Sequence, residues 1–349
     1  MRAGILTFHE ADNYGAVLQA YALQQTLMNL GAHGEFITID MERKKRPEPE
    51  AAKDIRLAAF AKKVQMESNK RSALFQNFRD EYFTCSRAYG MKEMTQLNAD
   101  FDCFVAGSDQ IWNFQIPDTD GRYFLPFAAP EKRFSYAASF GGHALPEKME
   151  KWCKSELEKF NKISVREEIG RRLIKELTGR DAAVSVDPTL LLDRAAWENL
   201  THDVEEPPYV LLFLLKYDEY AVAKAKEIAE KEGLQLKVIT AAFIPQLGFP
   251  AWSDVGVTDW LSFFKNASCV ITNSFHGVVF SILFERRFHV ARLQGELSAR
   301  NGRIEELLRN TGLSAAMDEM PEAVDYEPVK MHIMEMRKAS MDYLKEVVG

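Results

Sequence analysis

The stretch SCVITNSFHGVVFSILF, residues 268–284, changes from the hydrophobic pattern of a strand to that of a helix within a few residues. Residues 269–271 form a short apolar run rich in β-branched side chains, and apolar residues then recur at offsets of three and four over 275–283. The intervening Thr-Asn-Ser, residues 272–274, has side chains suited to capping a helix N-terminus. We therefore expect a strand, a tight turn and a buried helix whose N-terminus points outward.

The N-terminus of this helix has the composition of an anion site. Free backbone N–H groups and the positive end of the helix dipole attract negative charge, and Asn273 and Ser274 add polar side chains. Gly277 would let a ligand approach the backbone closely, and His276 would stand at the mouth of the site. A single histidine more often only caps or packs, but its neighbours here favour an anion pocket. At a helix N-terminus its cationic form is disfavoured unless a bound phosphate restores it.

Composition narrows the class of protein. The chain has 349 residues, which suits two domains of ordinary size. A net charge of −7 argues against a nucleic-acid partner, because there is no basic surplus to displace counterions from phosphates. Four cysteines lie far apart without a C-x-x-C pair, so no metal site or disulfide framework is indicated. The sequence implies neither a metal nor a cofactor.

The sequence contains no apolar run near the ~20 residues that a membrane helix requires. Its N-terminal apolar segment is too short, and followed too soon by acidic residues, for a signal peptide. We therefore expect a cytoplasmic protein without a transmembrane segment. Peripheral association with a lipid-linked glycan stays open.

Polar loops follow several predicted strands of the first half. Residues 3–8 read as a buried strand, followed by a loop with Asn13, Tyr14 and Gly15 and then by a helix. Ligands gather at the carboxyl ends of parallel strands, so we expect this loop at a binding site. A simple N-cap is an equally good reading for Asn13.

The run FDCFVAGSDQIWN repeats this arrangement. It predicts a strand over 101–106, followed by a turn that contains Gly107, Ser108 and Asp109. Arg166 follows another predicted strand, over 162–165, and can fork two hydrogen bonds onto a carboxylate or phosphate. The alternative for Arg166 is an ordinary ion pair on a solvated helix face.

These patterns predict an α/β fold with two Rossmann-like domains that face a cleft. We place an N-terminal domain, with Arg166 and the expected acceptor side, over residues 1–200. A second domain, with His276 and the anion or donor site, covers 208–320 after an EEPP linker. Residues 321–349 form an amphipathic C-terminal helix that packs across a sheet.

Several motifs together resemble the polysaccharide pyruvyl transferase family. They are NYGAVLQAYAL, FDCFVAGSDQIWN, YAASFGG, VREEIG, VDPTLLL, ITNSFHGVVFSILF and NGRIEELL, in that order, over residues 1–313. Members of this family move pyruvate from phosphoenolpyruvate onto two hydroxyls of a sugar, which forms a cyclic ketal. They are similar in architecture to two-domain GT-B glycosyltransferases. The resemblance implies phosphoenolpyruvate as donor and a saccharide as acceptor.

The resemblance also implies roles for individual residues. Arg166 of the VREE motif and His276 of the SFHG motif would hold or act on phosphoenolpyruvate. Some relatives have an arginine just before this histidine, where Ser274 and Phe275 stand here, so Arg303 could supply the missing charge. The reaction needs an acid, a base and anion clamps, and no metal is mandatory. We count Asp109 among the catalytic residues, but the sequence leaves open which of Glu10, Asp12, Asp109 and Glu167 is the acid.

Two other functions share this fold. A GT-B glycosyltransferase would use a sugar nucleotide, and the sequence Asp118-Thr119-Asp120 spells a D-x-D motif. That triplet follows a proline in a loop, so we read it as a turn. A glycan-related binding protein without catalysis is the third reading. The sequence leaves the acceptor sugar and the oligomeric state undetermined.

Overall fold

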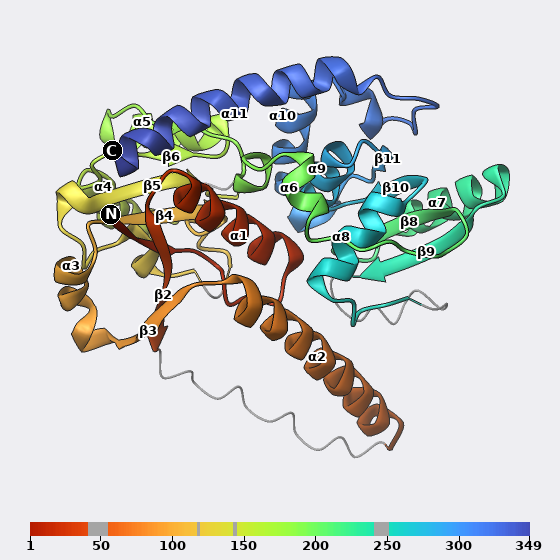
Figure 1. Ribbon diagram of the computed structural model, residues 1–349, viewed down its shortest axis with the longest axis horizontal. Helices are drawn as coiled ribbons and strands as arrows, with labels where there is room; N and C mark the ends of the chain where they lie inside the picture. The colour runs from red at the N-terminus through yellow and green to blue at the C-terminus, as the bar shows by residue number, and fades with distance from the viewer. Residues whose placement is uncertain (41–54, 117–118, 142–144, 241–250) are drawn as a thin grey trace.

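The computed structural model describes residues 1–40, 55–116, 119–141, 145–240 and 251–349. In these residues the chain forms two parallel β-sheets, each covered by helices (Figure 1). The predicted α/β class and the two Rossmann-like units are thereby confirmed.

The first sheet has seven described strands in the order β3-β2-β1-β4-β5-β6-β7, all parallel. The strands are β1 (Arg2–Leu6), β2 (His33–Asp40), β3 (Cys85–Gly90), β4 (Cys103–Asp109), β5 (Arg133–Ala138), β6 (Ser164–Val165) and β7 (Ala183–Val184). Strand β3 was not predicted. It lies at the edge of the sheet and has few buried residues, so its sequence contains no apolar run. Buried strands are easier to recognise because both of their faces are apolar.

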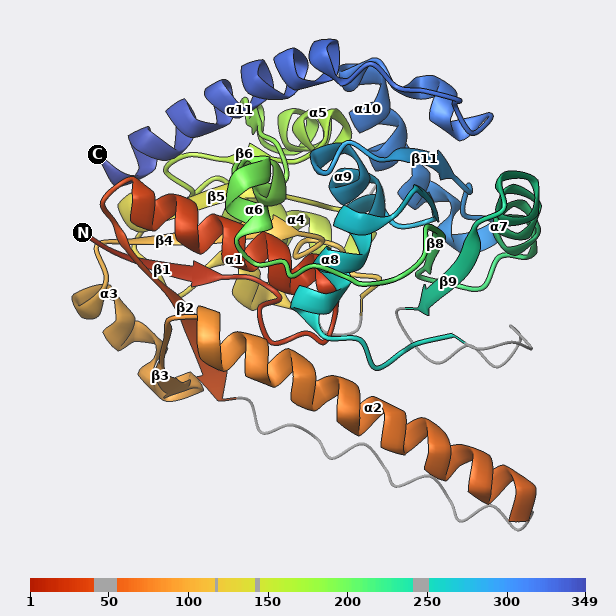
Figure 2. The same cartoon turned by 45° about the vertical axis from the view of Figure 1, so that its right-hand side comes forward.

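Helices cover both faces of the first sheet. In this half the helices are α1 (Tyr14–Asn29), α2 (Ile55–Tyr82), α3 (Leu97–Asp100), α4 (Glu147–Leu157), α5 (Glu168–Thr178) and α6 (Arg194–Glu198), with 3-10 turns at Met91–Gln96, Gly121–Phe124, Pro130–Lys132 and Pro188–Leu190. The apolar residues of α4 and α5 share a core with one face, and those of α1 share a core with the other. Helix α2 extends beyond the rest of the molecule (Figure 2).

The second sheet has four described strands in the order β11-β10-β8-β9, also parallel. They are β8 (Tyr209–Leu214), β9 (Gln235–Thr240), β10 (Cys269–Thr272) and β11 (Arg287–Val290). The helices here are α7 (Glu219–Glu232), α8 (Val257–Asn266), α9 (Phe275–Leu283) and α10 (Asn301–Thr311), with 3-10 turns at Gly295–Arg300 and Ser314–Met317. Strand β10 and helix α9 occupy the two halves of residues 268–284, as the change of period predicts.

The two halves share one hydrophobic core. Tyr14, at the start of α1, stacks on Trp260 of α8 at 5.1 Å between ring centroids and donates its hydroxyl hydrogen to the carbonyl of Val255 at 2.8 Å. Residues from both halves belong to the same buried apolar cluster. The domain boundaries at 200 and 208 stay a prediction. The strands of the first sheet all precede them in the chain, and the strands of the second sheet all follow them.

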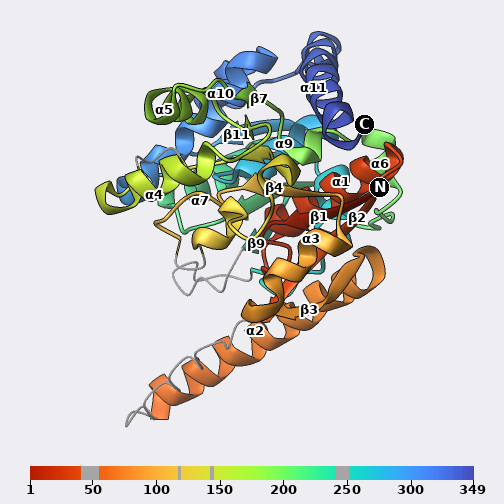
Figure 3. The same ribbon diagram turned by 90° about the vertical axis from the view of Figure 1, so that its left-hand side faces the viewer.

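The C-terminal helix α11 (Tyr326–Val348) runs along both halves (Figure 1). Figure 3 shows that its C-terminal end lies on the same side of the molecule as the N-terminus. Near its start the Tyr326 hydroxyl donates to the carbonyl of Arg286, and near its end the Tyr343 hydroxyl donates to the carbonyl of Ser135. Leu344 is fully buried against the first sheet. Within the described residues, no helix has the length and apolar character needed to cross a membrane.

Leu344→Ala should destabilise the protein by about 2–5 kcal/mol, because it leaves a cavity under the end of α11. Met334→Ala is the matched control: Met334 lies on the same helix and is 58% exposed, so its loss should cost no more than about 0.5 kcal/mol. Denaturant unfolding of both variants measures the difference. Equal stabilities would show that the end of α11 does not anchor the helix.

Candidate functional site

One buried carboxylate joins the two halves at the candidate site. Arg166 follows β6, and its Nη1 donates to Oδ2 of Asp187, which follows β7, at 2.6 Å. His276, in the first turn of α9, places Nε2 at 3.4 Å from the same oxygen, an ion-pair distance rather than a hydrogen bond. Arg166 and His276, predicted to share a site, therefore meet at one carboxylate.

Further carboxylates surround Arg166. Its Nε donates to Oε1 of Glu167 at 2.8 Å, and its Nη2 lies 3.7 Å from Oδ1 of Asp109. Burial opposes the charge on Arg166, but Glu167, Asp187 and Asp109 outweigh it and raise the pKa of Arg166 above its ordinary value. Burial likewise opposes the charge on Asp187, whereas His276 and Arg166 hold the pKa of Asp187 well below its usual range. Arg166 and Asp187 are therefore both ionised at neutral pH.

Arg303, on α10, is the second buried cation of the site. Burial and the charge of Arg166 lower the pKa of Arg303 to about 10, so it stays a cation at neutral pH. The guanidinium carbons of Arg166 and Arg303 lie 4.9 and 5.6 Å from the ring centroid of Phe275. Phe275 directly precedes His276, so both cations lie against the first turn of α9.

Several donor atoms of this group have no hydrogen-bond partner in the described part of the chain. They are Nη2 of Arg166, Nε of Arg303, Nε2 of His276 and Nε of the nearby Arg300, all buried. Buried N–H groups normally have partners. A small anion with several oxygen atoms would provide acceptors for these donors.

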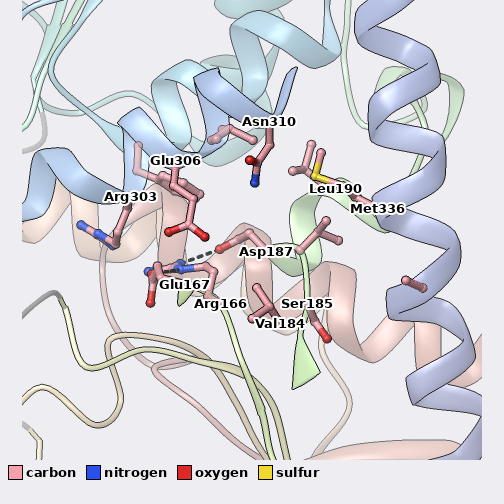
Figure 4. Close-up of a pocket in the computed structure, with 14 residues that line it drawn as sticks. Arg166, Glu167, Val184, Ser185, Asp187, Leu190, Arg303, Glu306, Asn310 and Met336 are labelled. Carbon is pink, nitrogen blue, oxygen red and sulfur yellow. Dashed lines mark hydrogen bonds and ion pairs between the residues drawn. The ribbon is translucent and has the colours of Figure 1, made fainter. Parts of the chain in front are cut away.

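A cavity of about 230 Å³ adjoins the buried ion pair (Figure 4). Arg166, Glu167, Asp187, Arg303 and Glu306 form its polar side, as Figure 4 shows. The rest of the wall is mainly apolar and comes from β7 and the turn after it, α10 and α11; it includes Val184, Val186, Leu190, Leu307 and Met336. The site thus combines an ionic cluster with an apolar wall, as small-molecule pockets commonly do.

The predicted NYG loop reaches the site through Gly15. A Cβ atom on Gly15 would lie 1.9 Å from Nδ1 of His276, so only glycine fits where the loop backbone meets the imidazole. Asn13 caps α1, with its side-chain oxygen accepting from Ala16 N at 3.1 Å. Tyr14 is buried in the core between the halves. These contacts give Asn13 and Tyr14 structural roles, and neither lines the cavity.

The predicted GSD turn is mostly internal. A Cβ on Gly107 would lie 2.6 Å from the carbonyl oxygen of Tyr136, and the buried Ser108 hydroxyl donates to the carbonyl of Ala137 at 3.0 Å. Asp109 has a left-handed backbone, φ 63°, and faces Arg166. Of these three residues, Asp109 alone joins the ionic cluster.

The polar residues around β10 and α9 support the fold locally. Asn273 accepts from Leu215 N at 2.8 Å and donates to the carbonyl of Lys216 at 2.9 Å. The Ser274 hydroxyl accepts from the N–H of Gly277 at 3.3 Å and so caps α9. A Cβ on Gly277 would lie 2.4 Å from Oγ1 of Thr272. The glycine lets α9 approach its own strand, and the two polar side chains hold the turn.

The D-x-D sequence is only partly described, because residue 118 lies outside the described ranges. Asp120 accepts from the N–H of Arg122 and pairs with its guanidinium at 2.6 Å. Among the described residues, no group of three or more His, Cys, Asp or Glu side chains is arranged to hold a metal ion.

Asp187 and Glu306 were not among the predicted site residues. Asp187 follows β7 as Arg166 follows β6, so its place after a strand is the signal that could have identified it. Glu306 lies on an amphipathic helix among other charged residues, and nothing in the sequence distinguishes it from the solvent-exposed ones.

Gly15→Ala should displace His276 and destabilise the protein by about 1–3 kcal/mol, the usual cost of overpacking. Gly302→Ala is the matched control on α10, because a Cβ there meets nothing within 4 Å; it should stabilise by about 0.5–1 kcal/mol. Denaturant unfolding should show a lower free energy of unfolding for Gly15→Ala and a higher one for Gly302→Ala than for wild type. A Gly15→Ala variant as stable as wild type would contradict the contact with His276.

Asp187→Asn should destabilise the protein by about 3–5 kcal/mol at pH 7, because it breaks a buried ion pair. The pKa of Asp187 is depressed in the folded state, so its stabilisation is complete above the unfolded pKa of about 3.9 and is lost as pH falls below it.

The difference between wild type and Asp187→Asn should therefore be equal at pH 7 and pH 5 and should shrink below about pH 4. Asp203→Asn is the control, since that side chain is 96% exposed. Urea unfolding at each pH measures the free energies. A difference that stays constant down to pH 3 would contradict the depressed pKa.

Solved structures share the fold. The UDP-GlcNAc 2-epimerase from Methanocaldococcus jannaschii matches with a TM-score of 0.53 at 11% identity, over 100% of this chain and 99% of that one. A candidate UDP-N-acetylglucosamine 2-epimerase from Listeria monocytogenes matches with a TM-score of 0.50 at 11% identity, over 99% and 90%. The glycosyltransferase SnogD from Streptomyces nogalater matches with a TM-score of 0.40 at 11% identity, over 100% and 99%. The fold is GT-B-like.

No curated protein matches the chain. The family model for polysaccharide pyruvyl transferase matches residues 13–291, which include β4, Arg166, Asp187 and the SFHG motif. That range covers most of the chain and includes strands of both sheets. The protein therefore belongs to the polysaccharide pyruvyl transferase family.

Proposed function

We propose that the protein transfers pyruvate from phosphoenolpyruvate to two hydroxyls of a sugar in a polysaccharide or its precursor, with release of phosphate. The observation that carries this proposal is the meeting of Arg166 and His276 at one buried carboxylate, next to donor atoms of Arg166 and Arg303 that have no hydrogen-bond partner in the described residues. Family membership supports the reaction class.

The two arginines suit the donor substrate. Phosphoenolpyruvate carries a carboxylate and a phosphate, and guanidinium groups bind both in a forked geometry. Arg166 is fixed by Asp187 and Glu167 but keeps Nη2 for a ligand, and Arg303 keeps Nε. Some relatives have an arginine directly before the histidine, whereas this chain has Phe275 there. Arg303 lies against the ring of Phe275 and provides a cation near that position.

His276 is suited to carry a proton in the reaction. The methylene carbon of the enol ether must gain a proton, a sugar hydroxyl then attacks the adjacent carbon, and a second hydroxyl displaces phosphate. Each hydroxyl loses a proton as it attacks. An imidazole held between Gly15 and Asp187 has a defined orientation and can accept such a proton. We assign His276 this role, with Asp187 as the positioning residue.

For the sugar-nucleotide alternative, Asp120 of the D-x-D sequence is already paired with Arg122. Thermal shift separates this alternative from the proposal. A ligand at a hundred times its dissociation constant adds about 2.7 kcal/mol to the folded state. We expect that stabilisation with phosphoenolpyruvate and none with a panel of sugar nucleotides; the reverse pattern would favour the alternative. No stabilisation by either would favour a binding protein without catalysis.

His276→Ala should slow phosphate release from phosphoenolpyruvate and a saccharide acceptor by at least about 10²-fold, the usual contribution of a general base. Phosphorus NMR with galactose- and mannosamine-containing acceptors follows the release. His332→Ala, an exposed position on α11, is the control and should behave as wild type. Near-normal turnover by His276→Ala would refute the assignment.

A further inference from the structure

Glu306 extends from α10 into the cavity beside Arg166 and Glu167 (Figure 4). Its two carboxylate oxygens lie 3.1 and 3.4 Å from the backbone nitrogen of Glu168, and both accept from that N–H. Glu168 is the first residue of α5, so this N–H has no partner within its own helix. A donor from the first half of the molecule therefore fixes a carboxyl group from the second half.

The charges around Glu306 differ from those around the other carboxylates. Glu167 and Glu168 face it from α5, Arg303 and Arg309 lie on its own helix, and Arg166 and Asp187 belong to the same polar wall. In the described part of the chain, however, no Lys, Arg or His nitrogen lies within 4.0 Å of its oxygens. Glu167 and Asp187, by contrast, are both held by Arg166.

This environment shifts Glu306 toward its neutral acid form. Burial, together with the negative charges of Glu167 and Glu168, raises the pKa of Glu306, although the N–H of Glu168 and the charge of Arg309 act against this. Asp187 has a depressed pKa and cannot hold a proton near neutral pH. Among the carboxyl groups of the cavity wall, Glu306 is the one suited to deliver a proton.

We propose that Glu306 is the catalytic acid that protonates the methylene carbon of phosphoenolpyruvate, an assignment that rests on the function proposed above. The sequence left the acid open among Glu10, Asp12, Asp109 and Glu167. The structure places both Asp109 and Glu167 against the Arg166 guanidinium.

The proton and electron balance is as follows. The π electrons of the enol ether form a C–H bond with the proton of Glu306, and the methylene becomes a methyl group. The first hydroxyl oxygen bonds to the adjacent carbon and gives its proton to His276. The second hydroxyl oxygen bonds to the same carbon as the C–O bond to phosphate breaks; phosphate leaves with that electron pair and takes the second proton. The proton on His276 returns to Glu306 through solvent.

The test compares Glu306→Gln with Glu305→Gln. In Glu306→Gln the side-chain amide oxygen would still accept from the Glu168 N–H, and Glu305 is an exposed neighbour on the same helix. Each variant is mixed with phosphoenolpyruvate and the acceptor that turns over with wild type, in D₂O. Phosphorus NMR follows phosphate release, proton NMR follows deuterium in the new methyl group and in the vinyl position, and thermal shift reports donor binding.

Glu306→Gln should keep the thermal shift with phosphoenolpyruvate but lose phosphate release and deuterium incorporation by about 10²–10⁴-fold. In wild type the rate should fall as pH rises above the pKa of the acid, and this fall should be absent from the residual rate of Glu306→Gln. Glu306→Asp, which keeps a carboxyl group, should recover part of the rate. Glu305→Gln should match wild type.

Glu306→Gln turning over within about threefold of wild type, with the same pH dependence, would overturn the assignment of Glu306 and leave the proposed function intact. Glu306→Asp as slow as Glu306→Gln, with both lacking the thermal shift, would show that Glu306 positions the site and does not deliver the proton. Wild-type protein that neither releases phosphate nor shifts with phosphoenolpyruvate would overturn the proposed function itself.

Discussion

The buried Asp187 carboxylate is the constraint on which the site depends. A carboxylate without exposure is strongly destabilising unless cations and hydrogen bonds compensate it. Here the compensation comes from Arg166, in the first half, His276, in the second, and the hydroxyl and N–H of Thr189. Because Arg166 and His276 come from different halves, the cluster around Asp187 is complete only when the two halves pack together.

The packing around this carboxylate leaves little freedom to the imidazole. Gly15 removes the side chain that would otherwise occupy the position of His276, and Ser274 and Gly277 set the start of α9 against β10. Tyr14, next to Gly15, ties the same loop to α8 of the second half. A functional group held on regular elements by a packed surrounding shell is placed more reproducibly than one on a free loop. The loop predicted to bind substrate acts mainly by positioning the histidine.

The sequence was sufficient for the parts of the structure that depend on local periodicity. The change of pattern at 268–284 identified β10, α9 and the place of His276, and Arg166 was recognisable because it follows a strand. The sequence pattern of a polar or aromatic residue after a strand is the same whether the side chain contacts a ligand or packs against another domain. Tyr14 and Asn273 were therefore predicted as binding residues, although neither lines the cavity. Asp187 escaped notice because its partners lie 21 and 89 positions away, and that proximity arises only from packing of the two halves.

The charge balance of the cavity bears on how it could receive an anion. Asp109, Glu167 and Asp187 already surround the Arg166 guanidinium, so an incoming phosphoenolpyruvate must share that cation and meets repulsion from its carboxylates. Within the described residues no carboxylate forms an ion pair with Arg303, and the raised pKa of Glu306 favours the loss of a further negative charge from the same wall. In the proposed function, donor binding and retention of the proton on Glu306 therefore reinforce each other, since each is more favourable when the other is present. Of these carboxylates, Glu167 also raises the pKa of Glu306, so a group that would weaken binding of a bare anion helps to keep a proton beside it.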